Sequence, residues 1–256
     1  MDIKNKTAIV TGGASGLGKA TVERYIADGA NVAIFDLDEK GGQALAESLG
    51  ERAIFCKVNV ADEASAAAGI TQVIETFGAL HILNNYAGIG SACKTYGKNG
   101  PHPLDTYMKV VMVNQVGTFN MARLAAERMA ANEPVNEDGV RGVIINTASV
   151  AAYEGQIGQV AYSATKGAVV GMTLPMAREL ASYGIRVNTI VPGLIHTPLF
   201  ETVEESYYKS LEASTVFPQR LGKTSEIAAL SAHIVENDYI NGECIRMDAG
   251  IRMQPR

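Results

Sequence analysis

Seven short apolar runs, separated by longer segments in which apolar residues recur with helical spacing, constrain the fold of this chain more than any other feature. Most of the runs lack strict alternation of apolar and polar residues, which is typical of strands covered on both faces. Apolar runs that alternate with helical segments indicate βαβ units. The sequence therefore predicts an α/β fold with a seven-stranded, mostly parallel, doubly wound sheet and helices on both faces. The predicted strands are Thr7–Val10, Asn31–Phe35, Ala53–Val58, His81–Leu83, Gly142–Asn146, Arg186–Val191 and Glu243–Met247.

Composition excludes several classes of protein. With 256 residues, 47% of them hydrophobic and 19% charged, the chain suits one soluble globular domain spanning residues 1–256. A net charge of −5 argues against a nucleic-acid partner, because phosphate binding needs clustered Lys and Arg. No run reaches the roughly 18 apolar residues that predict a membrane helix. Three widely spaced cysteines and the lack of a recognisable signal peptide favour a reducing compartment, and we expect a cytoplasmic location.

A glycine-rich turn, Thr11–Gly18, lies between the first predicted strand and a helix predicted over Lys19–Asp28. Gly12 would permit a tight turn, Gly16 would let the backbone approach a phosphate, and Gly18 would let the helix pack near the strand. Glycines also end strands for ordinary reasons, so the turn alone is weak evidence. Its place between strand and helix favours a Rossmann dinucleotide site.

Asp36 ends the second predicted strand, 18 residues after Gly18. A carboxylate about 20 residues beyond the turn typically accepts hydrogen bonds from the adenosine ribose. It would repel the 2′-phosphate of NADP, and Leu37 follows it where an arginine would favour that phosphate. The alternatives are a turn-forming Asp and the use of Asp38 instead. We predict NAD as the cofactor.

Tyr162 and Lys166 stand four residues apart within a helix predicted from about Gln159 to Tyr183, and Ser149 precedes Tyr162 by 13 positions. Side chains at this helical spacing share a face, so we expect the Lys166 ammonium to lower the pKa of the phenol. Ser149 follows a predicted strand, at the edge where α/β sheets bind ligands. The pattern predicts Tyr162 as an acid/base and Ser149 as a group that holds a carbonyl or hydroxyl oxygen. A Tyr–Lys pair alone would be more typical of a solvated helix face.

A second helix is predicted over Leu104–Met129, and Asn114 lies on its apolar face. A polar amide on an apolar stripe is unusual, because a buried polar group needs a partner. We therefore single out Asn114.

These motifs together resemble the short-chain dehydrogenase/reductase family over essentially the whole chain. Thr11–Gly18 is similar to the family's T-G-x-x-x-G-x-G turn, and Asn114–Gly117 is similar to its N-x-x-G. Asn85–Gly88 resembles its N-N-A-G element, with Tyr86 where Asn or Cys is usual. Ser149, Tyr162–Lys166 and Pro192-Gly193 match the remaining elements.

The resemblance implies roles for further residues. Asn114 would distort its helix and hold a water that completes a proton relay from Lys166, so the implied catalytic set is Asn114, Ser149, Tyr162 and Lys166. A buried Asn satisfied by the backbone is the alternative. The implied cofactor residues are Gly12, Ser15, Gly16, Leu17, Gly18, Asp36, Leu37, Asn59, Val60, Asn85, Ala87, Gly88, Tyr162, Lys166, Pro192, Gly193, Ile195 and Thr197. The cofactor-binding half would cover about 1–140, and the catalytic half about 141–256.

Several stretches resemble a narrower branch, the type II 3-hydroxyacyl-CoA dehydrogenases (the 17β-hydroxysteroid dehydrogenase type 10 group): Thr147–Gln156, Gly171–Pro175, Lys94–Tyr96 and Ile251–Pro255. This resemblance implies reversible, NAD-dependent interconversion of 3-hydroxyacyl-CoA and 3-ketoacyl-CoA. Gln156, Gln159 and the segment beginning at Leu199 would line the substrate. Lys94 and Lys98 would either meet CoA phosphates or belong to a solvated loop unrelated to the substrate.

Other functions stay open at this point. A 3-oxoacyl carrier protein reductase and a hydroxysteroid or secondary alcohol dehydrogenase share the same catalytic set, and a non-catalytic dinucleotide sensor or scaffold would share the cofactor site. The four histidines show no metal-ligand spacing, so we expect no metal. The resemblance implies a homotetramer assembled through the helices that carry Asn114 and Tyr162.

Overall fold

The computed structural model describes residues 1–90, 92–198 and 204–255. Its main sheet has seven strands in the order β3-β2-β1-β4-β7-β8-β11, and every neighbouring pair is parallel. The direction of winding changes between β1 and β4, and parallel sheets bind ligands beyond the carboxyl ends of strands at such a point. The strands are β1 (Thr7–Thr11), β2 (Asn31–Asp36), β3 (Ala53–Lys57), β4 (Ile82–Asn85), β7 (Gly142–Thr147), β8 (Ile185–Pro192) and β11 (Cys244–Met247). The predicted fold class is confirmed.

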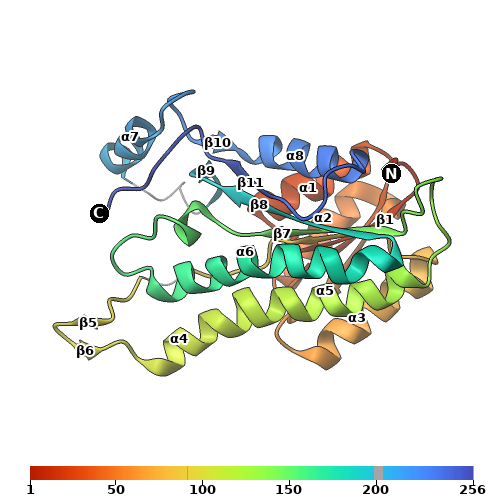
Figure 1. The fold of residues 1–256 in the computed structure, drawn as a ribbon, viewed down its shortest axis with the longest axis horizontal. Helices are drawn as coiled ribbons and strands as arrows, with labels where there is room; N and C mark the ends of the chain where they lie inside the picture. Colours follow the sequence, from red (N-terminus) through yellow and green to blue (C-terminus); the bar gives the residue numbers. More distant parts are fainter. Residues whose placement is uncertain (91, 199–203, 256) are drawn as a thin grey trace.

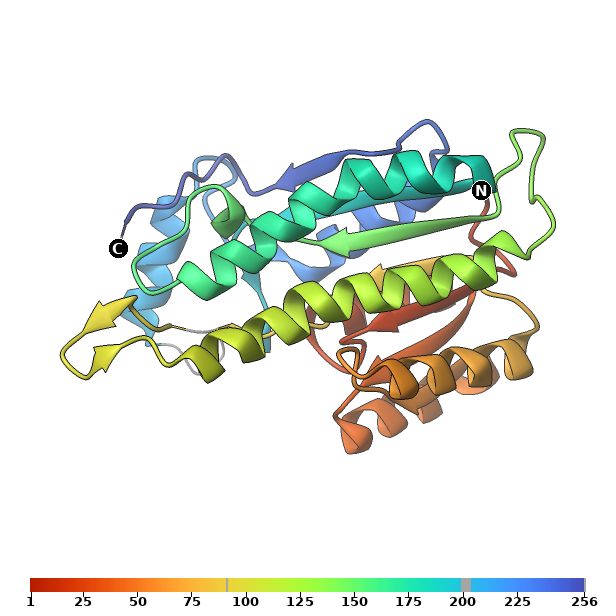
Figure 2. The same ribbon diagram turned by 60° about the horizontal axis from the view of Figure 1, so that its bottom comes forward.

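Helices cover both faces of this sheet, and each face has its own apolar core (Figures 1 and 2). Successive strand residues alternate between the two cores, as Ile9 and Val10 do, because side chains along a strand point to opposite faces. One face packs against α1 (Gly16–Ala27), α2 (Glu39–Leu49) and α8 (Thr224–Glu236). The other packs against α3 (Glu63–Phe77), α5 (Gly117–Ala130) and α6 (Val160–Leu180).

The helix predicted over Leu104–Met129 is interrupted. It consists of α4 (Leu104–Val110), a π-helical turn (Val111–Val116) and α5. The turn contains Asn114, whose side chain is completely buried. Such π-bulges occur frequently at functional sites. The distortion at Asn114 that the family resemblance implies is present.

The helix that carries Tyr162 and Lys166 is α6, which runs without interruption past Pro175 and continues as a 3₁₀ turn, Ala181–Tyr183. Pro175 has no N–H to donate to Gly171, so α6 lacks one backbone hydrogen bond at this point. Figure 2 shows α5 and α6 side by side across the sheet. This arrangement brings Asn114 and Tyr162 to the same end of the sheet.

Two small strand pairs stand outside the main sheet, and the sequence pattern did not predict them. β5 (Tyr96–Gly97) and β6 (Gly100–Pro101) form an antiparallel hairpin, and β9 (Ile195–His196) pairs with β10 (Gly222–Lys223). The hairpin, α7 (Glu205–Ser214) and the C-terminus all lie at the end of the molecule to which the strands point (Figure 1). Within the part of the chain that the structure describes, no helix is long and apolar enough to cross a membrane.

Candidate active site

The glycine turn has the shape that a phosphate cradle needs. Gly12 has a φ of +64°, and a Cβ there would lie 2.9 Å from the Ala87 nitrogen. A Cβ at Gly18 would overlap the carbonyl oxygen of Gly12, so only glycine lets α1 begin this close to β1. Ser15 makes no side-chain cap at the start of α1, which leaves the first amides of the helix available to an anion. These residues fit the phosphates of a dinucleotide.

Asp36 ends β2 beside this turn. Its Oδ2 accepts a hydrogen bond from the Ala14 amide at 3.0 Å, and its Oδ1 accepts one from the Asp38 amide at 3.1 Å. Asp38 instead caps α2 by accepting from the Gly41 amide. Of these two carboxylates, Asp36 is therefore the one held against the glycine turn, where a ribose would lie.

Buried hydrogen bonds connect the carboxyl ends of the central strands. Asn85 donates to Asn146 Oδ1 at 2.9 Å, and the Ala87 amide donates to the Thr11 hydroxyl at 3.1 Å. These bonds join the carboxyl ends of β1, β4 and β7. Within this motif, Asn85 and Ala87 hold the strand ends together, and Gly88 borders the site.

Tyr86, the departure from the family motif, also borders the site. Its hydroxyl lies 2.6 Å from the Ser231 hydroxyl of α8 and accepts a hydrogen bond from Thr21 of α1 at 3.0 Å. Burial raises the pKa of this phenol, so it stays neutral. Tyr86 connects β4 to the helix that follows the glycine turn.

Ser149, Tyr162 and Lys166 meet at the carboxyl end of β7. The Ser149 hydroxyl lies near the Tyr162 phenol, and Lys166 Nζ lies 5.7 Å from the centre of the Tyr162 ring. Lys166 also donates to the Thr147 carbonyl at 2.6 Å. The structure thus brings together the three residues that the sequence predicted.

Burial dominates the electrostatics of this group. It raises the pKa of the Tyr162 phenol, and the nearby Ser149 hydroxyl offsets part of that rise. Burial also lowers the pKa of the Lys166 ammonium from 10.5 to about 8. The net shift at Tyr162 is opposite in sign to the lowering that we expected from Lys166, because the spacing on the helix carries no information about desolvation.

Asn114 is satisfied by protein groups. Its Nδ2 donates to the Ile89 carbonyl at 2.9 Å and to the Thr165 hydroxyl at 3.2 Å, and its Oδ1 accepts from the Ile89 amide at 2.8 Å. A Cβ at Gly88 would lie 3.3 Å from that Oδ1 and 3.7 Å from Lys166 Nζ. Asn114 therefore holds the loop after β4 close to Lys166, which agrees with the alternative of a buried Asn bonded to the backbone. Its part in a proton relay stays a prediction.

A cavity of about 750 Å³ opens over the catalytic group. Of the predicted residues, those that line it are Leu17, Gly88, Ser149, Gln159, Tyr162, Lys166, Pro192, Gly193, Ile195 and Thr197. Gln156 lies instead in an adjoining hollow of about 620 Å³, together with Lys94 and Tyr96. Leu199 lies outside the described residues.

The remaining predicted cofactor residues lie farther along the same edge. Leu37 is exposed beyond β2, and Val60 is buried after β3. The Asn59 Oδ1 accepts from the Ala61 amide at 3.1 Å, so this side chain stabilises its own turn. Among the described residues, no group of His, Cys, Asp and Glu side chains is arranged to hold a metal ion.

Sequence reasoning missed several residues of the cavity wall, among them Ile89 and Met253. The signal for Ile89 was its place directly after the Asn85–Gly88 motif. No local signal exists for Met253, which approaches the cavity from the segment that follows the last strand.

Comparison with known proteins agrees with this geometry. The family model for short chain dehydrogenases matches residues 6–207. The chain is 50% identical to a 3-hydroxyacyl-CoA dehydrogenase type-2 of Drosophila melanogaster, over 99% of this chain and 100% of that one. It is 49% identical to the human protein of that name, over 99% of this chain and 97% of the relative.

A solved structure is similar as well. The crystal structure of a 3-hydroxyacyl-CoA dehydrogenase type-2 from Mycobacterium avium has a TM-score of 0.95 and 44% sequence identity, and the match covers 98% of both chains. A 3alpha-hydroxysteroid dehydrogenase of Mediterraneibacter gnavus is 34% identical, over 98% of this chain and 99% of the relative. The chain belongs to the short-chain dehydrogenase family, whose members are oxidoreductases that use a nicotinamide dinucleotide.

Proposed function

We propose that this protein is an NAD-dependent 3-hydroxyacyl-CoA dehydrogenase that interconverts 3-hydroxyacyl-CoA and 3-ketoacyl-CoA. The observation that carries the proposal is the full-length identity of about 50% to relatives of that name, together with the Ser149, Tyr162 and Lys166 group at the base of a large cavity. The likeness extends beyond the catalytic residues, which are common to enzymes with many alcohol substrates.

The catalytic residues divide the proton chemistry among them. A bound NAD supplies the hydride acceptor when an alcohol is oxidised. Ser149 donates a hydrogen bond to the substrate oxygen, and the Tyr162 oxygen removes the hydroxyl proton. Lys166, buried below the phenol, stabilises the phenolate that begins this step. Fixed groups of this kind lower the barrier because they are already oriented before the reaction.

The choice of NAD over NADP follows from charge. The Asp36 carboxylate is fixed by two backbone amides at the end of β2, and Leu37 beside it is 62% exposed. Lys57 Nζ, on the neighbouring strand, is paired with Glu39 at 2.9 Å. A 2′-phosphate would therefore be repelled by the Asp36 carboxylate, and none of these residues offers it an unpaired positive charge. The ribose hydroxyls of NAD would instead donate hydrogen bonds to that carboxylate.

An acyl-CoA fits the space beside the catalytic cavity. The hollow that contains Lys94 and Gln156 shares Ala151 with the catalytic cavity, so one extended ligand can occupy both. The acyl end would lie over Tyr162, and the ammonium of Lys94 would face the CoA phosphates.

Turnover of acetoacetyl-CoA with NADH tests the proposal. We expect the purified protein to oxidise NADH only when the ketone is present, with a higher kcat/KM for NADH than for NADPH. If the protein binds NADH but reduces neither acyl-CoA, carrier-protein nor steroid ketones, a dinucleotide sensor or scaffold replaces the enzyme.

A hydroxysteroid is the second candidate substrate, and the 34% identity to the bacterial 3alpha-hydroxysteroid dehydrogenase favours it over other alcohols. Competition between a 3-hydroxysteroid and 3-hydroxybutyryl-CoA for the same enzyme separates the two. The acyl-CoA proposal expects kcat/KM to be larger for the CoA ester.

We infer that the protein is a homotetramer. Phe119 of α5, Leu174 of α6 and Tyr183 of the 3₁₀ turn after α6 are 48%, 44% and 54% exposed, and a groove of about 450 Å³ lies between α5 and α6. Apolar surface of this kind marks interaction sites. Light scattering should give four times the mass of the chain, and a stable monomer would contradict the inference.

We also propose a cytoplasmic location. Cys56, Cys93 and Cys244 are all free, which suits a reducing compartment. Fractionation of the source cells with an antibody against the protein tests this point, and enrichment in an organelle would contradict it.

A further inference from the structure

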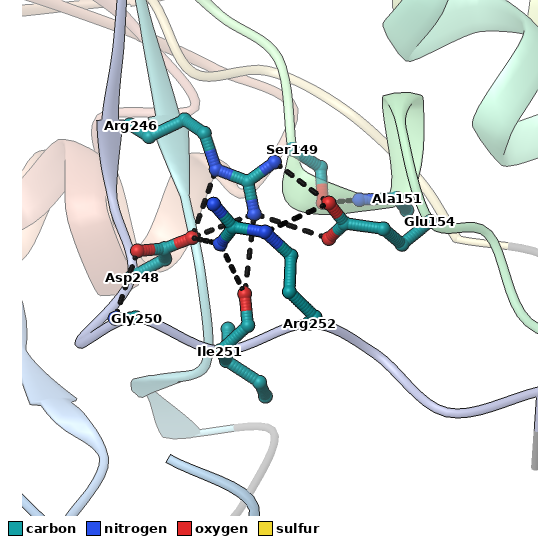
Figure 3. A network of polar contacts seen from close by, with 8 residues as sticks. All are labelled: Ser149, Ala151, Glu154, Arg246, Asp248, Gly250, Ile251 and Arg252. Atoms are coloured by element: carbon teal, nitrogen blue, oxygen red, sulfur yellow. Dashed lines mark hydrogen bonds and ion pairs between the residues drawn. The ribbon is translucent and has the colours of Figure 1, made fainter. Parts of the chain in front are cut away.

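Four charged side chains form a closed network beside the catalytic cavity (Figure 3). The guanidinium of Arg246, at the end of β11, donates to both oxygens of Glu154 at 2.9 and 3.0 Å. It also donates to Asp248 Oδ2 at 2.7 Å and to the Ile251 carbonyl at 3.2 Å. Arg252 completes the group by donating to the same Asp248 oxygen at 3.2 Å. Two positive and two negative charges thus neutralise one another.

The network joins two segments that are distant in the sequence. Glu154 lies just beyond the short 3₁₀ turn Val150–Ala152, and the Ser149 hydroxyl caps that turn by accepting from the Ala151 amide at 3.1 Å. On the other side is the tail, which we define as residues 248–255. The tail has no helix or strand, so no ladder of backbone hydrogen bonds fixes its position.

The tail contributes to the catalytic cavity. Ile251 is 2% exposed and packs in one apolar cluster with Ala148 and Val150, the residues on either side of Ser149. Met253 packs against this cluster and lines the cavity. Farther along, the Pro255 carbonyl accepts a hydrogen bond from the Ile157 amide at 3.0 Å.

We propose that Met253 is a specificity-determining residue for the acyl chain, and that the network of Glu154, Arg246, Asp248 and Arg252 is a clamp that holds the tail so that Met253 forms this wall. The inference rests on the proposed function, because it assigns a wall of the same site. Arg246 and Glu154 act through Met253 and are positioning residues. Bidentate Arg–carboxylate pairs are suited to this task, since the fork fixes orientation as well as distance.

Substrates of two lengths test the wall. Met253→Ala should widen the cavity, so that a short chain loses a contact and a longer chain gains room. We expect the ratio of kcat/KM for 3-hydroxyoctanoyl-CoA to that for 3-hydroxybutyryl-CoA to rise about ten-fold, within the range that a methylene-sized change produces. The Kd for NADH should not change. A ratio within about two-fold of the original would overturn the assignment of Met253.

A double-mutant cycle tests the clamp. Glu154→Gln should raise the same kcat/KM ratio. The double variant Glu154→Gln/Met253→Ala should raise this ratio no further than Met253→Ala alone, because both changes act on one wall. If the two single variants change the ratio by factors that multiply in the double variant, or if Glu154→Gln leaves the ratio unchanged, the clamp is refuted. Arg246→Lys is a milder variant, which keeps the charge but loses the fork and should shift the ratio in the same direction.

Amide hydrogen exchange gives a readout that does not depend on turnover. Glu154→Gln should speed exchange at Ile157, whose amide is bonded to the tail, by at least about ten-fold, because loss of the clamp favours local opening. Asp28→Asn is the matched control: it removes the carboxylate of the Arg24–Asp28 pair, 2.6 Å long, at the far end of α1. Exchange at Ile157 should be normal in this control. If the original protein oxidises neither substrate, the proposed function fails, whereas unchanged exchange at Ile157 in Glu154→Gln contradicts the clamp alone.

Discussion

Asn114 and Ile89 exchange a pair of hydrogen bonds in which the Asn114 side chain both accepts from the Ile89 amide and donates to the Ile89 carbonyl. The π-helical turn places Asn114 where one amide side chain can satisfy both backbone groups. Ile89 lines the catalytic cavity, so this contact couples the distorted helix to the wall of the site.

Asn114→Ala should reduce both stability and turnover. The change leaves two backbone groups of Ile89 without partners, and a buried unsatisfied group costs about 1–3 kcal/mol. We expect a lower Tm and a lower kcat. Asn132→Ala is the control, because Asn132 also donates to two carbonyls, those of Leu80 and Arg141, far from the cavity. It should lower the Tm with kcat unchanged, and an equal loss of kcat in both variants would contradict a specific role of Asn114.

Lys166 gives the protein a pH-dependent stability. Its folded-state pKa of about 8 lies below the unfolded value of 10.5, so the unfolded chain binds more protons between these limits and stability rises with pH across this window. The difference between the two pKa values lowers the free energy of unfolding by about 3 kcal/mol at pH values below the folded-state pKa. Lys166→Met should remove this cost. In denaturant titrations the variant should be more stable than the original near neutral pH, and this advantage should shrink as the pH rises through the window. An advantage that is independent of pH would contradict the burial argument.

Tyr162→Phe should abolish turnover without loss of cofactor. The ring and its packing remain, while the hydroxyl that takes the substrate proton is removed. We expect kcat to fall by a factor of about 100 to 10,000, which is typical for loss of an acid/base group. Fluorescence titration with NADH should give a Kd close to that of the original protein. Retained turnover would displace Tyr162 as the base.

The sequence was sufficient for the elements that local pattern determines. The seven main strands lie within two residues of their predicted bounds, because apolar runs such as Asn31–Phe35 are bracketed by turns or charged residues. The glycine turn and the meeting of Tyr162 with Lys166 follow from spacing in the same way. Local pattern also placed Asp36 at the correct strand end.

The features that depend on distant contacts could not be predicted in this way. Periodicity gave one helix over Leu104–Met129, whereas the π-turn accompanies bonds between Asn114 and a residue 25 positions earlier; only the family resemblance indicated it. Met253 lines the cavity from the C-terminal segment, beside a network that joins Arg246 to Glu154, 92 positions earlier in the chain. The sign of the pKa shift at Tyr162 depends on burial, which is a property of the whole fold.

Asp36 should control the choice between NAD and NADP. Its carboxylate is held by the Ala14 and Asp38 amides, so it meets the ribose in a fixed orientation. Asp36→Ala removes a charge-assisted hydrogen bond worth about 1.5–3 kcal/mol, and kcat/KM for NAD should fall about 10- to 100-fold. The same change removes the repulsion of a 2′-phosphate, so kcat/KM for NADP should rise. Adding Leu37→Arg should increase activity with NADP further, because a guanidinium can bind the phosphate in a bidentate manner. A parallel fall for both cofactors would mean that Asp36 only stabilises the turn, and that another residue selects NAD.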